Sequence, residues 1–209
     1  MTRFLASCSP ASLALAALGL AACASPRSVP HLASARVVSD FDSYTLHRVG
    51  LLPPVGPAVT PDHGADLSAA LFAEFSARTD LEIVPLTAAD LEAIRSLEPY
   101  RRGGYAPRSV LAIAGRYRLD ALLIPTVTDL QVHPPQRLGL SVDLVSTETG
   151  QALWSSSVQL DAARETVRNA LKVWAEREVG DVSDTTWELT LISPRRFARY
   201  AAYQVAALM

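Results

Sequence analysis

The stretch from Leu138 to Leu160 limits the folds open to this chain of 209 residues more than any other feature. Leucine or valine occupies every second position from Leu138 to Leu144, and the segment from Ala152 to Leu160 repeats the alternation. A period of two is that of a β-strand with one face on a core and the other in solvent. The turn Thr147-Glu148-Thr149-Gly150 joins the two segments and ends in a glycine, which tolerates positive φ. Residues 138–160 therefore predict an antiparallel hairpin.

Short apolar runs elsewhere predict further strands that are covered on both faces. The runs are Val49–Leu52 and Ala121–Ile124, and Leu81–Val84, which contains Glu82, predicts another short strand. The run Ala121–Ile124 continues past Pro125 to about Val132, and because proline cannot donate to a ladder we expect a bulge or a local strand edge there.

Apolar residues at helical spacing predict the helices. Three predicted helices have a start signal: a cap at Asp66 begins a helix that runs to about Arg78, a capping box at Thr87–Asp90 begins one that runs through residue 97, and Ser193-Pro194 begins one that runs to the carboxyl end. Two more helices are predicted over residues 110–117 and 167–174. Residues 187–192 fit a strand or an ordered loop. The sequence thus predicts an α/β fold: one domain of two or three layers, with helices packed on a central mixed sheet that contains the hairpin.

The amino-terminal segment resembles the signal of a bacterial lipoprotein. Arg3 precedes an apolar run over residues 11–22, which is too short and too rich in glycine and alanine for a membrane span. Leu20-Ala21-Ala22-Cys23 looks like a lipobox, and this resemblance implies cleavage before Cys23 and lipid attachment to that cysteine. The alternative is a buried amino-terminal helix with an incidental cysteine.

This resemblance divides the chain into a signal peptide over residues 1–22, a lipidated cysteine with a flexible tether over residues 23–44, and an α/β domain over residues 45–209. The expected location is the periplasmic face of a bacterial outer membrane, with the inner membrane as the alternative. The expected partners are the membrane, through the lipid on Cys23, and an envelope protein.

Composition excludes some classes of function. The formal net charge of −2 does not favour a nucleic-acid partner. The only cysteines are Cys8 and Cys23, so residues 24–209 contain neither a disulfide nor a thiol nucleophile.

Several strings resemble the periplasmic domains of the curli-secretion (CsgG-like) lipoproteins and of the lipoprotein activators of penicillin-binding proteins (LpoB-like). These strings are Val49–Pro53, Asp66–Leu71, Leu81–Pro85, Gly115–Leu123 and Val142–Trp154. The resemblance implies the same fold and a non-catalytic protein-binding or assembly role in the cell envelope. A glycine of that family before its central strand is replaced here by Leu119-Asp120-Ala121.

Candidate catalytic residues are sparse. No two histidines have the spacing that would present two imidazoles to one metal, and there is no Gly-x-Ser-x-Gly elbow and no phosphate-binding glycine loop. We therefore expect no cofactor, no metal and no enzymatic activity. An alternative, a hydrolase of envelope polymers, requires Asp120, His133 and Asp143 to converge on one pocket.

Two loops carry the residue types that dominate protein interfaces, tyrosine and arginine. The candidate binding residues are Tyr100, Arg101, Arg102 and Tyr105 in the first loop, and His133 and Arg137 in the second. A further alternative is a ring-forming subunit of a secretion assembly, although the one predicted hairpin is accounted for by the domain's own sheet rather than by a pore.

Overall fold

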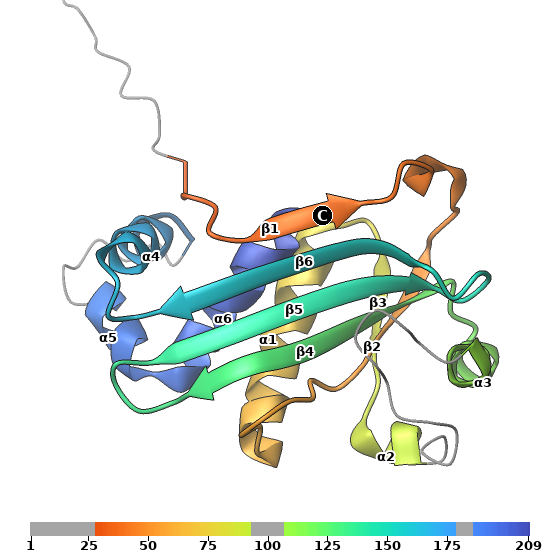
Figure 1. The fold of residues 1–209 in the computed structure, drawn as a ribbon, viewed down its shortest axis with the longest axis horizontal. Helices are drawn as coiled ribbons and strands as arrows, with labels where there is room; N and C mark the ends of the chain where they lie inside the picture. Colours follow the sequence, from red (N-terminus) through yellow and green to blue (C-terminus); the bar gives the residue numbers. More distant parts are fainter. Residues whose placement is uncertain (1–27, 93–106, 179–185) are drawn as a thin grey trace, which may run out of the picture.

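The computed structural model describes residues 28–92, 107–178 and 186–209, and its centre is a six-stranded mixed sheet (Figure 1). The order of strands across the sheet is β1-β6-β5-β4-β2-β3. The strands are β1 (Ser34–Val37), β2 (Arg48–Leu51), β3 (Glu82–Pro85), β4 (Ala121–Gln131), β5 (Arg137–Ser146) and β6 (Ala152–Asp161). β2 is parallel to β3 and β4, whereas β4, β5, β6 and β1 pair antiparallel. The predicted α/β class with a central mixed sheet is confirmed.

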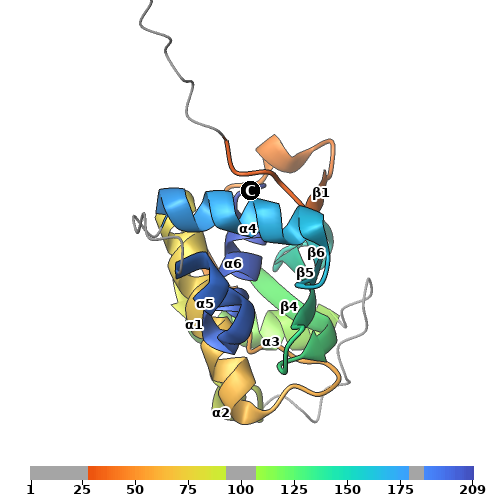
Figure 2. The same cartoon turned by 90° about the vertical axis from the view of Figure 1, so that its left-hand side faces the viewer.

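Helices cover one face of this sheet. The helices are α1 (Pro61–Arg78), α2 (Ala88–Glu92), α3 (Pro107–Tyr117), α4 (Glu165–Glu178), α5 (Thr186–Ile192) and α6 (Pro194–Ala206), with a short 3-10 helix at Phe41–Ser43. Figure 2 shows α1, α4, α5 and α6 together on one side of the strands. None of the helices in the described ranges is long and apolar enough to cross a bilayer.

The main core lies between that helix layer and the sheet. Its largest side chains are aromatic: the rings of Phe75 and Trp154 meet edge to face at 6.1 Å, and those of Trp174 and Tyr200 lie 5.2 Å apart. Such pairs stabilise a core beyond the area that they bury. A smaller apolar cluster on the opposite face joins Ile113 of α3 to Leu122 and Ile124 of β4. The domain therefore has two layers along β5 and β6 and a third layer only near β2 and the start of β4.

An ion-paired carboxylate ties α1 to α6 within the helix layer. Glu74 is 6% exposed, and its two oxygens accept hydrogen bonds from Arg78 Nε at 3.1 Å and Arg199 Nε at 3.3 Å. The Arg78 guanidinium also lies 4.3 Å from the ring centroid of Tyr203. A carboxylate so far from water is stable because both of its oxygens are bonded to cations.

The hairpin and two of the three predicted helix caps, those at Thr87 and Ser193, follow the sequence predictions. β5 and β6 pair antiparallel, and Gly150 in their turn has a φ of 71°. The Thr87 amide donates to Asp90 Oδ2 at 2.8 Å while the Asp90 amide donates back to Thr87 Oγ1 at 3.3 Å, which is the predicted capping box. The Ser193 hydroxyl accepts from the Arg196 amide at 3.4 Å and caps α6. The predicted irregularity of β4 lies between Val127 and Asp129 rather than at Pro125.

The described part of the expected tether, residues 28–44, differs from a flexible linker. β1 pairs with β6, and Val29 is only 3% exposed. Gln204 of α6 fixes the backbone before β1, because its Oε1 accepts from the Leu32 amide at 2.7 Å and its Nε2 donates to Pro30 O at 3.0 Å. These bonds use backbone groups, so they leave no side-chain period in the sequence.

Two helices also differ from expectation. α1 begins after Thr60, whose hydroxyl accepts from the His63 amide at 3.3 Å, and not at Asp66. Its apolar stripe starts only at Leu67, so periodicity could not reveal the first turns. Residues 187–192 belong to helix α5, where Trp187 and Leu191, four residues apart, pack on the core. The α-helix over Thr186–Ile192 replaces both the strand and the loop interpretation, and residues four apart share a face of a helix.

Candidate binding surfaces

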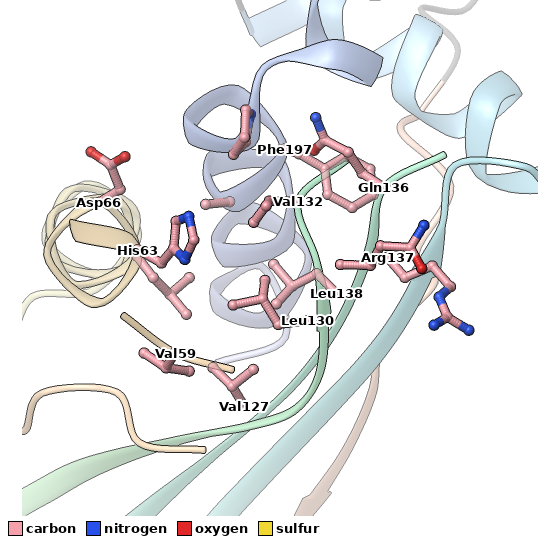
Figure 3. A pocket seen from close by; sticks show the side chains of 14 residues that line it. Val59, His63, Asp66, Val127, Leu130, Val132, Gln136, Arg137, Leu138 and Phe197 are labelled. Carbon is pink, nitrogen blue, oxygen red and sulfur yellow. The ribbon is translucent and has the colours of Figure 1, made fainter. Parts of the chain in front are cut away.

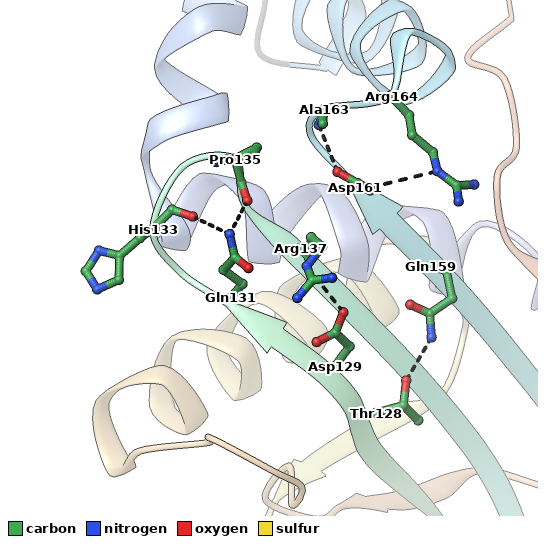
Figure 4. Close-up of polar contacts among 10 residues, drawn as sticks. All are labelled: Thr128, Asp129, Gln131, His133, Pro135, Arg137, Gln159, Asp161, Ala163 and Arg164. Carbon is green, nitrogen blue, oxygen red and sulfur yellow. Dashed lines mark hydrogen bonds and ion pairs between the residues drawn. The ribbon is translucent and has the colours of Figure 1, made fainter.

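The loop between β4 and β5 is the one predicted binding loop that lies within the described residues. Gln131 Nε2 donates to the carbonyl oxygens of His133 and Pro135, at 3.2 and 2.8 Å, and so closes the loop on itself (Figure 4). His133 is exposed and its ring points away from the domain, while Arg137 Nε lies 3.7 Å from Asp129 Oδ2. The loop is therefore held in shape, and it presents an imidazole and a half-exposed guanidinium to solvent.

The other predicted residues, Tyr100, Arg101, Arg102 and Tyr105, and the lipidation candidate Cys23 lie outside the described residues. Their roles stay predictions. The structure thus neither joins the two predicted loops into one surface nor separates them.

The sheet face opposite α1 and α6 is a second candidate surface, which we call the hydroxyl face. No helix in the described ranges covers it along β5, β6 and β1 (Figure 1). Its side chains alternate with the core residues of the same strands and are mostly small and polar: Ser34, Arg36, Thr126, Thr128, Ser141, Asp143, Ser155, Ser157 and Gln159. Ser141 and Asp143 are 5% and 8% exposed, so they are recessed between the neighbouring strands.

One cross-strand bridge shapes this face. Gln159 Nε2 donates to Thr128 Oγ1 at 3.0 Å across β5, and Gly139 lies beneath the bond (Figure 4). A Cβ atom at position 139 would lie 2.3 Å from Thr128 Oγ1. Because Gly139 has no side chain, the side chains of Thr128 on β4 and Gln159 on β6 can bond to each other across β5.

A third candidate is an apolar crevice on the helix side, which we call the loop crevice. It lies between the first turns of α1, the start of α6 and the β4–β5 loop (Figure 3). Its walls include Val59, Leu67, Leu130, Leu138 and Phe197, and it encloses a cavity of about 30 Å³. That space holds one water molecule or a small apolar group.

Two nitrogen atoms of residues that line the loop crevice have no hydrogen-bond partner among the described residues. They are Nδ1 of His63, on α1, and Nε2 of Gln136, in the β4–β5 loop. Gln136 is only 1% exposed. The sequence predicted the loop but not these two residues, because nothing in the sequence shows that the first turn of α1 and residue 136 line the same crevice.

The structure does not bring together the three residues that the hydrolase alternative requires. Asp120 precedes β4 and its Oδ2 accepts from the amides of His47 and Arg48, both at 2.9 Å. His133 follows the other end of the same strand, roughly 35 Å away at about 3.3 Å per residue, and Asp143 lies midway along β5 on the hydroxyl face. No group of three or more potential metal ligands occurs within the described ranges.

A clasp between α2 and α3 shifts the pKa values of two side chains. Asp90 accepts hydrogen bonds from the Tyr117 hydroxyl and from Thr87, and these bonds lower its pKa to about 2. The same bond to Asp90 raises the pKa of Tyr117. Burial raises the pKa of Tyr200 as well. A general acid or base works best with a pKa near the working pH, and these shifts lead away from neutrality, so the clasp is structural.

Comparison with known proteins gives distant similarities of fold. No protein-family model matches the sequence, and a comparison with curated proteins gives no match. Among solved structures, a PelC dodecamer from Paraburkholderia phytofirmans has 14% identity and a TM-score of 0.44, and the match covers 78% of this chain and 97% of that chain. Lipoprotein GNA1162 from Neisseria meningitidis has 16% identity and a TM-score of 0.43, with 65% and 97% covered. The LpoB C-terminal domain from Escherichia coli has 15% identity and a TM-score of 0.39, with 57% and 87% covered.

All three TM-scores lie below 0.5, so none of these similarities carries a functional argument. They agree with the expected likeness to LpoB-like lipoproteins at the level of a distant fold. The curli-secretion part of the expected resemblance stays a prediction.

Proposed function

We propose that this protein is a lipid-anchored lipoprotein of the bacterial cell envelope whose domain binds another envelope protein and catalyses no reaction. The observation that carries the location is the string Leu20-Ala21-Ala22-Cys23 after an apolar run of signal-peptide length. Acyl chains on Cys23 would each add roughly 0.8 kcal/mol of membrane affinity per buried CH₂ group, and more than one chain gives a stable anchor.

The ordered amino-terminal part of the domain supports a close approach to the membrane. Val29 is buried, and it follows Cys23 by six residues. At an extended length of about 3.5 Å per residue, the domain surface would lie within roughly 20 Å of the anchor. The proposed location is the periplasmic face of the outer membrane.

The side chains of the domain support recognition rather than catalysis. The ionisable residues that a hydrolase would need are far apart, whereas the hydroxyl face offers a flat array of serine, threonine and glutamine with one recessed carboxylate at Asp143. Such groups form hydrogen bonds at low entropic cost, because serine and threonine have short side chains.

Lipid attachment is tested by labelling with a radioactive fatty acid in cells. The unmodified chain should incorporate label and sediment with membranes, and Cys23→Ala should lose the label and appear in the soluble fraction. Cys8→Ala is the matched control and should label normally. A Cys23→Ala chain that keeps both the label and the membrane association would contradict the proposal.

Protein binding is tested with a photo-crosslinking amino acid at Ser157 on the hydroxyl face and, as the control, at Arg168 on α4. We expect one discrete heteromeric adduct from position 157 and none from position 168. Equal adduct patterns from both positions would refute recognition through this face.

A second candidate is the ring-forming subunit, which the two different edges of the open sheet would allow. β1 and β3 lie at opposite edges of the sheet, and each has one partner strand among the described residues. Head-to-tail pairing of two different edges generates rings or filaments. Light scattering on the detergent-extracted lipoprotein separates the two: a closed oligomer favours the ring, and a monomer excludes it.

A further inference from the structure

The chain between the proposed lipid and the folded domain is short, because the domain holds its own first residues in place. Val29 is 3% exposed and belongs to the main core. The buried Gln204 holds the residues that follow by their backbone, since its Oε1 accepts from the Leu32 amide and its Nε2 donates to Pro30 O. Six residue steps separate Cys23 from Val29, so at about 3.5 Å per residue they lie within roughly 20 Å of each other.

These first residues lead directly into one edge of the sheet. The order β1-β6-β5-β4-β2-β3 places β1 at that edge and β3 at the opposite one. In Figures 1 and 2, which share their vertical axis, the chain enters the domain at the top, next to β1, and α2 lies at the bottom. The proposed anchor therefore approaches the domain from the β1 edge of the sheet.

The strand order gives the distance of each strand from that edge. Neighbouring strands lie about 4.8 Å apart, so the five steps from β1 to β3 amount to about 24 Å. The twist of a sheet rotates the strands relative to one another and leaves the order of these distances unchanged. A domain that rested on β3 would hold Val29 about 24 Å from the bilayer or farther, which is beyond the roughly 20 Å that six residues span.

The contacts of Val29 and Gln204, which we call the clamp, decide whether this restriction holds. If residues 29–33 came free, eleven residue steps would separate Cys23 from the first residue of β1, Ser34. That length of chain can span about 38 Å, which exceeds the width of about 24 Å across the sheet. The domain could then turn over on its tether, so the clamp and not the length of the sequence limits its orientation.

We propose that the clamp turns the β1 edge of the sheet toward the phospholipid headgroups of the membrane that holds the lipid on Cys23. β3 then lies farthest from the bilayer, and the hydroxyl face and the helix layer both face sideways, along the membrane. Gln204 is a positioning residue in this arrangement, because it acts through the backbone of Pro30 and Leu32. The inference deepens the proposed lipid anchoring and rests on it.

The test measures how far three strands lie from the membrane. The protein is produced with a fluorescent amino acid at one of three exposed positions: Arg36 on β1, Gln159 on β6 or Glu82 on β3. It is isolated with its lipid and inserted into vesicles of phosphatidylethanolamine and phosphatidylglycerol that contain an acceptor-labelled lipid. Energy transfer reports the distance of each position from the lipid surface. We expect this distance to increase from 36 to 159 to 82, and the depth difference between 36 and 82 to be at least about 12 Å, half the width of the sheet.

Two changes loosen the tether in different ways. A spacer of about ten Gly and Ser residues after Ser25 lengthens the tether without touching the domain, and it should reduce the depth difference to less than half. Gln204→Leu removes both bonds to the first residues and should also reduce the depth difference, in a chain whose folding is checked by circular dichroism. Gln151→Leu, the same change in the exposed turn between β5 and β6, is the matched control and should leave the depth difference unchanged.

Equal distances at positions 36 and 82, or the reverse order, would overturn the proposal, as would a depth difference that the spacer leaves intact. A lipid-carrying chain without a depth difference would refute the orientation and leave the anchor intact.

A chain that carries no lipid would refute the anchor, and the orientation is then measured separately. The Cys8→Ala chain is coupled through the thiol of Cys23 to a maleimide-bearing lipid in the same vesicles. The expected order of distances would support the orientation without the natural anchor, and equal distances would refute both.

Discussion

The two faces of strands β5 and β6 show how one backbone can serve two purposes. Toward the helices the strands present Leu144, Trp154 and Val158, all at most 2% exposed, and toward the hydroxyl face the neighbouring positions carry Asp143, Ser155 and Ser157. The two sets differ by one residue in register. The buried side chains on the helix-covered face therefore supply most of the stability. The side chains on the hydroxyl face are under little packing constraint.

The largest expected effect is on the helix-covered face. Trp154→Ala removes a ring that packs on Phe75 and whose Nε1 donates to Leu208 O at 3.1 Å. We expect a loss of about 3–5 kcal/mol in the free energy of unfolding, measured by urea denaturation. The matched change on the other face, Ser155→Ala, should cost less than about 0.5 kcal/mol. Similar losses for the two variants would show that the hydroxyl face is part of a buried core.

The next effect concerns the contact that holds the helix layer together. Glu74→Ala leaves Arg78 and Arg199 without the carboxylate that both contact, and we expect a loss of about 1–3 kcal/mol. Glu176→Ala, at an exposed position of α4, is the control and should change little. A loss under about 0.5 kcal/mol from Glu74→Ala would mean that packing alone joins α1 to α6.

Gly139→Ala tests whether the hydroxyl face has any packing demand of its own. The new methyl group would lie 2.3 Å from Thr128 Oγ1 and 2.5 Å from Gln159 Nε2, so it must displace the bridge between them. Because both partners are side chains that can rotate away, we expect a loss of about 0.5–1 kcal/mol, the value of the hydrogen bond. Gly115→Ala has no atom within 4 Å of the new methyl group and should instead stabilise α3 by about 0.5–1 kcal/mol. An unchanged midpoint for Gly139→Ala would show that the bridge yields freely.

The smallest effect concerns the third layer, in which α3 packs on the start of β4. This layer lies on the same side of the sheet as the hydroxyl face. The pKa of Asp90 is depressed from 3.8 to about 2, so the carboxylate contributes stability above about pH 4 that is lost as pH falls toward 2. Asp90→Asn and Tyr117→Phe should each weaken the dependence of the melting temperature on pH between about pH 4 and pH 2. Circular dichroism measures the melting temperature at each pH. Two variants with the same acid dependence as the unmodified chain would contradict this assignment.

The sequence predicts those elements whose signal is a side-chain pattern. The hairpin was predictable because one of its faces is buried, and the caps at Thr87 and Ser193 because a short polar side chain precedes a helical stripe. β1 was not, since its pairing with β6 uses backbone groups of four exposed residues. The first turns of α1 were missed because Leu67 is the first buried residue of that helix.

The candidate sites divide in the same way. The loop around His133 was predictable from Pro134-Pro135, which stiffens it. His63 and Gln136 line the same crevice because α1 crosses the end of β4, and no local sequence pattern predicts such a crossing. The distribution of serine and threonine on the hydroxyl face became visible only when the register of β1, β6, β5 and β4 was known.

The bonds of Gln204 to Pro30 and Leu32 have a mechanical consequence if Cys23 carries the lipid that we propose. Any pull between the membrane and a bound partner enters the domain at residue 28. The load reaches the two hydrogen bonds of Gln204 and the buried side chain of Val29 before it reaches β1. Because Gln204 belongs to the last helix, the force passes directly into the centre of the fold, and the edge strand is spared from peeling.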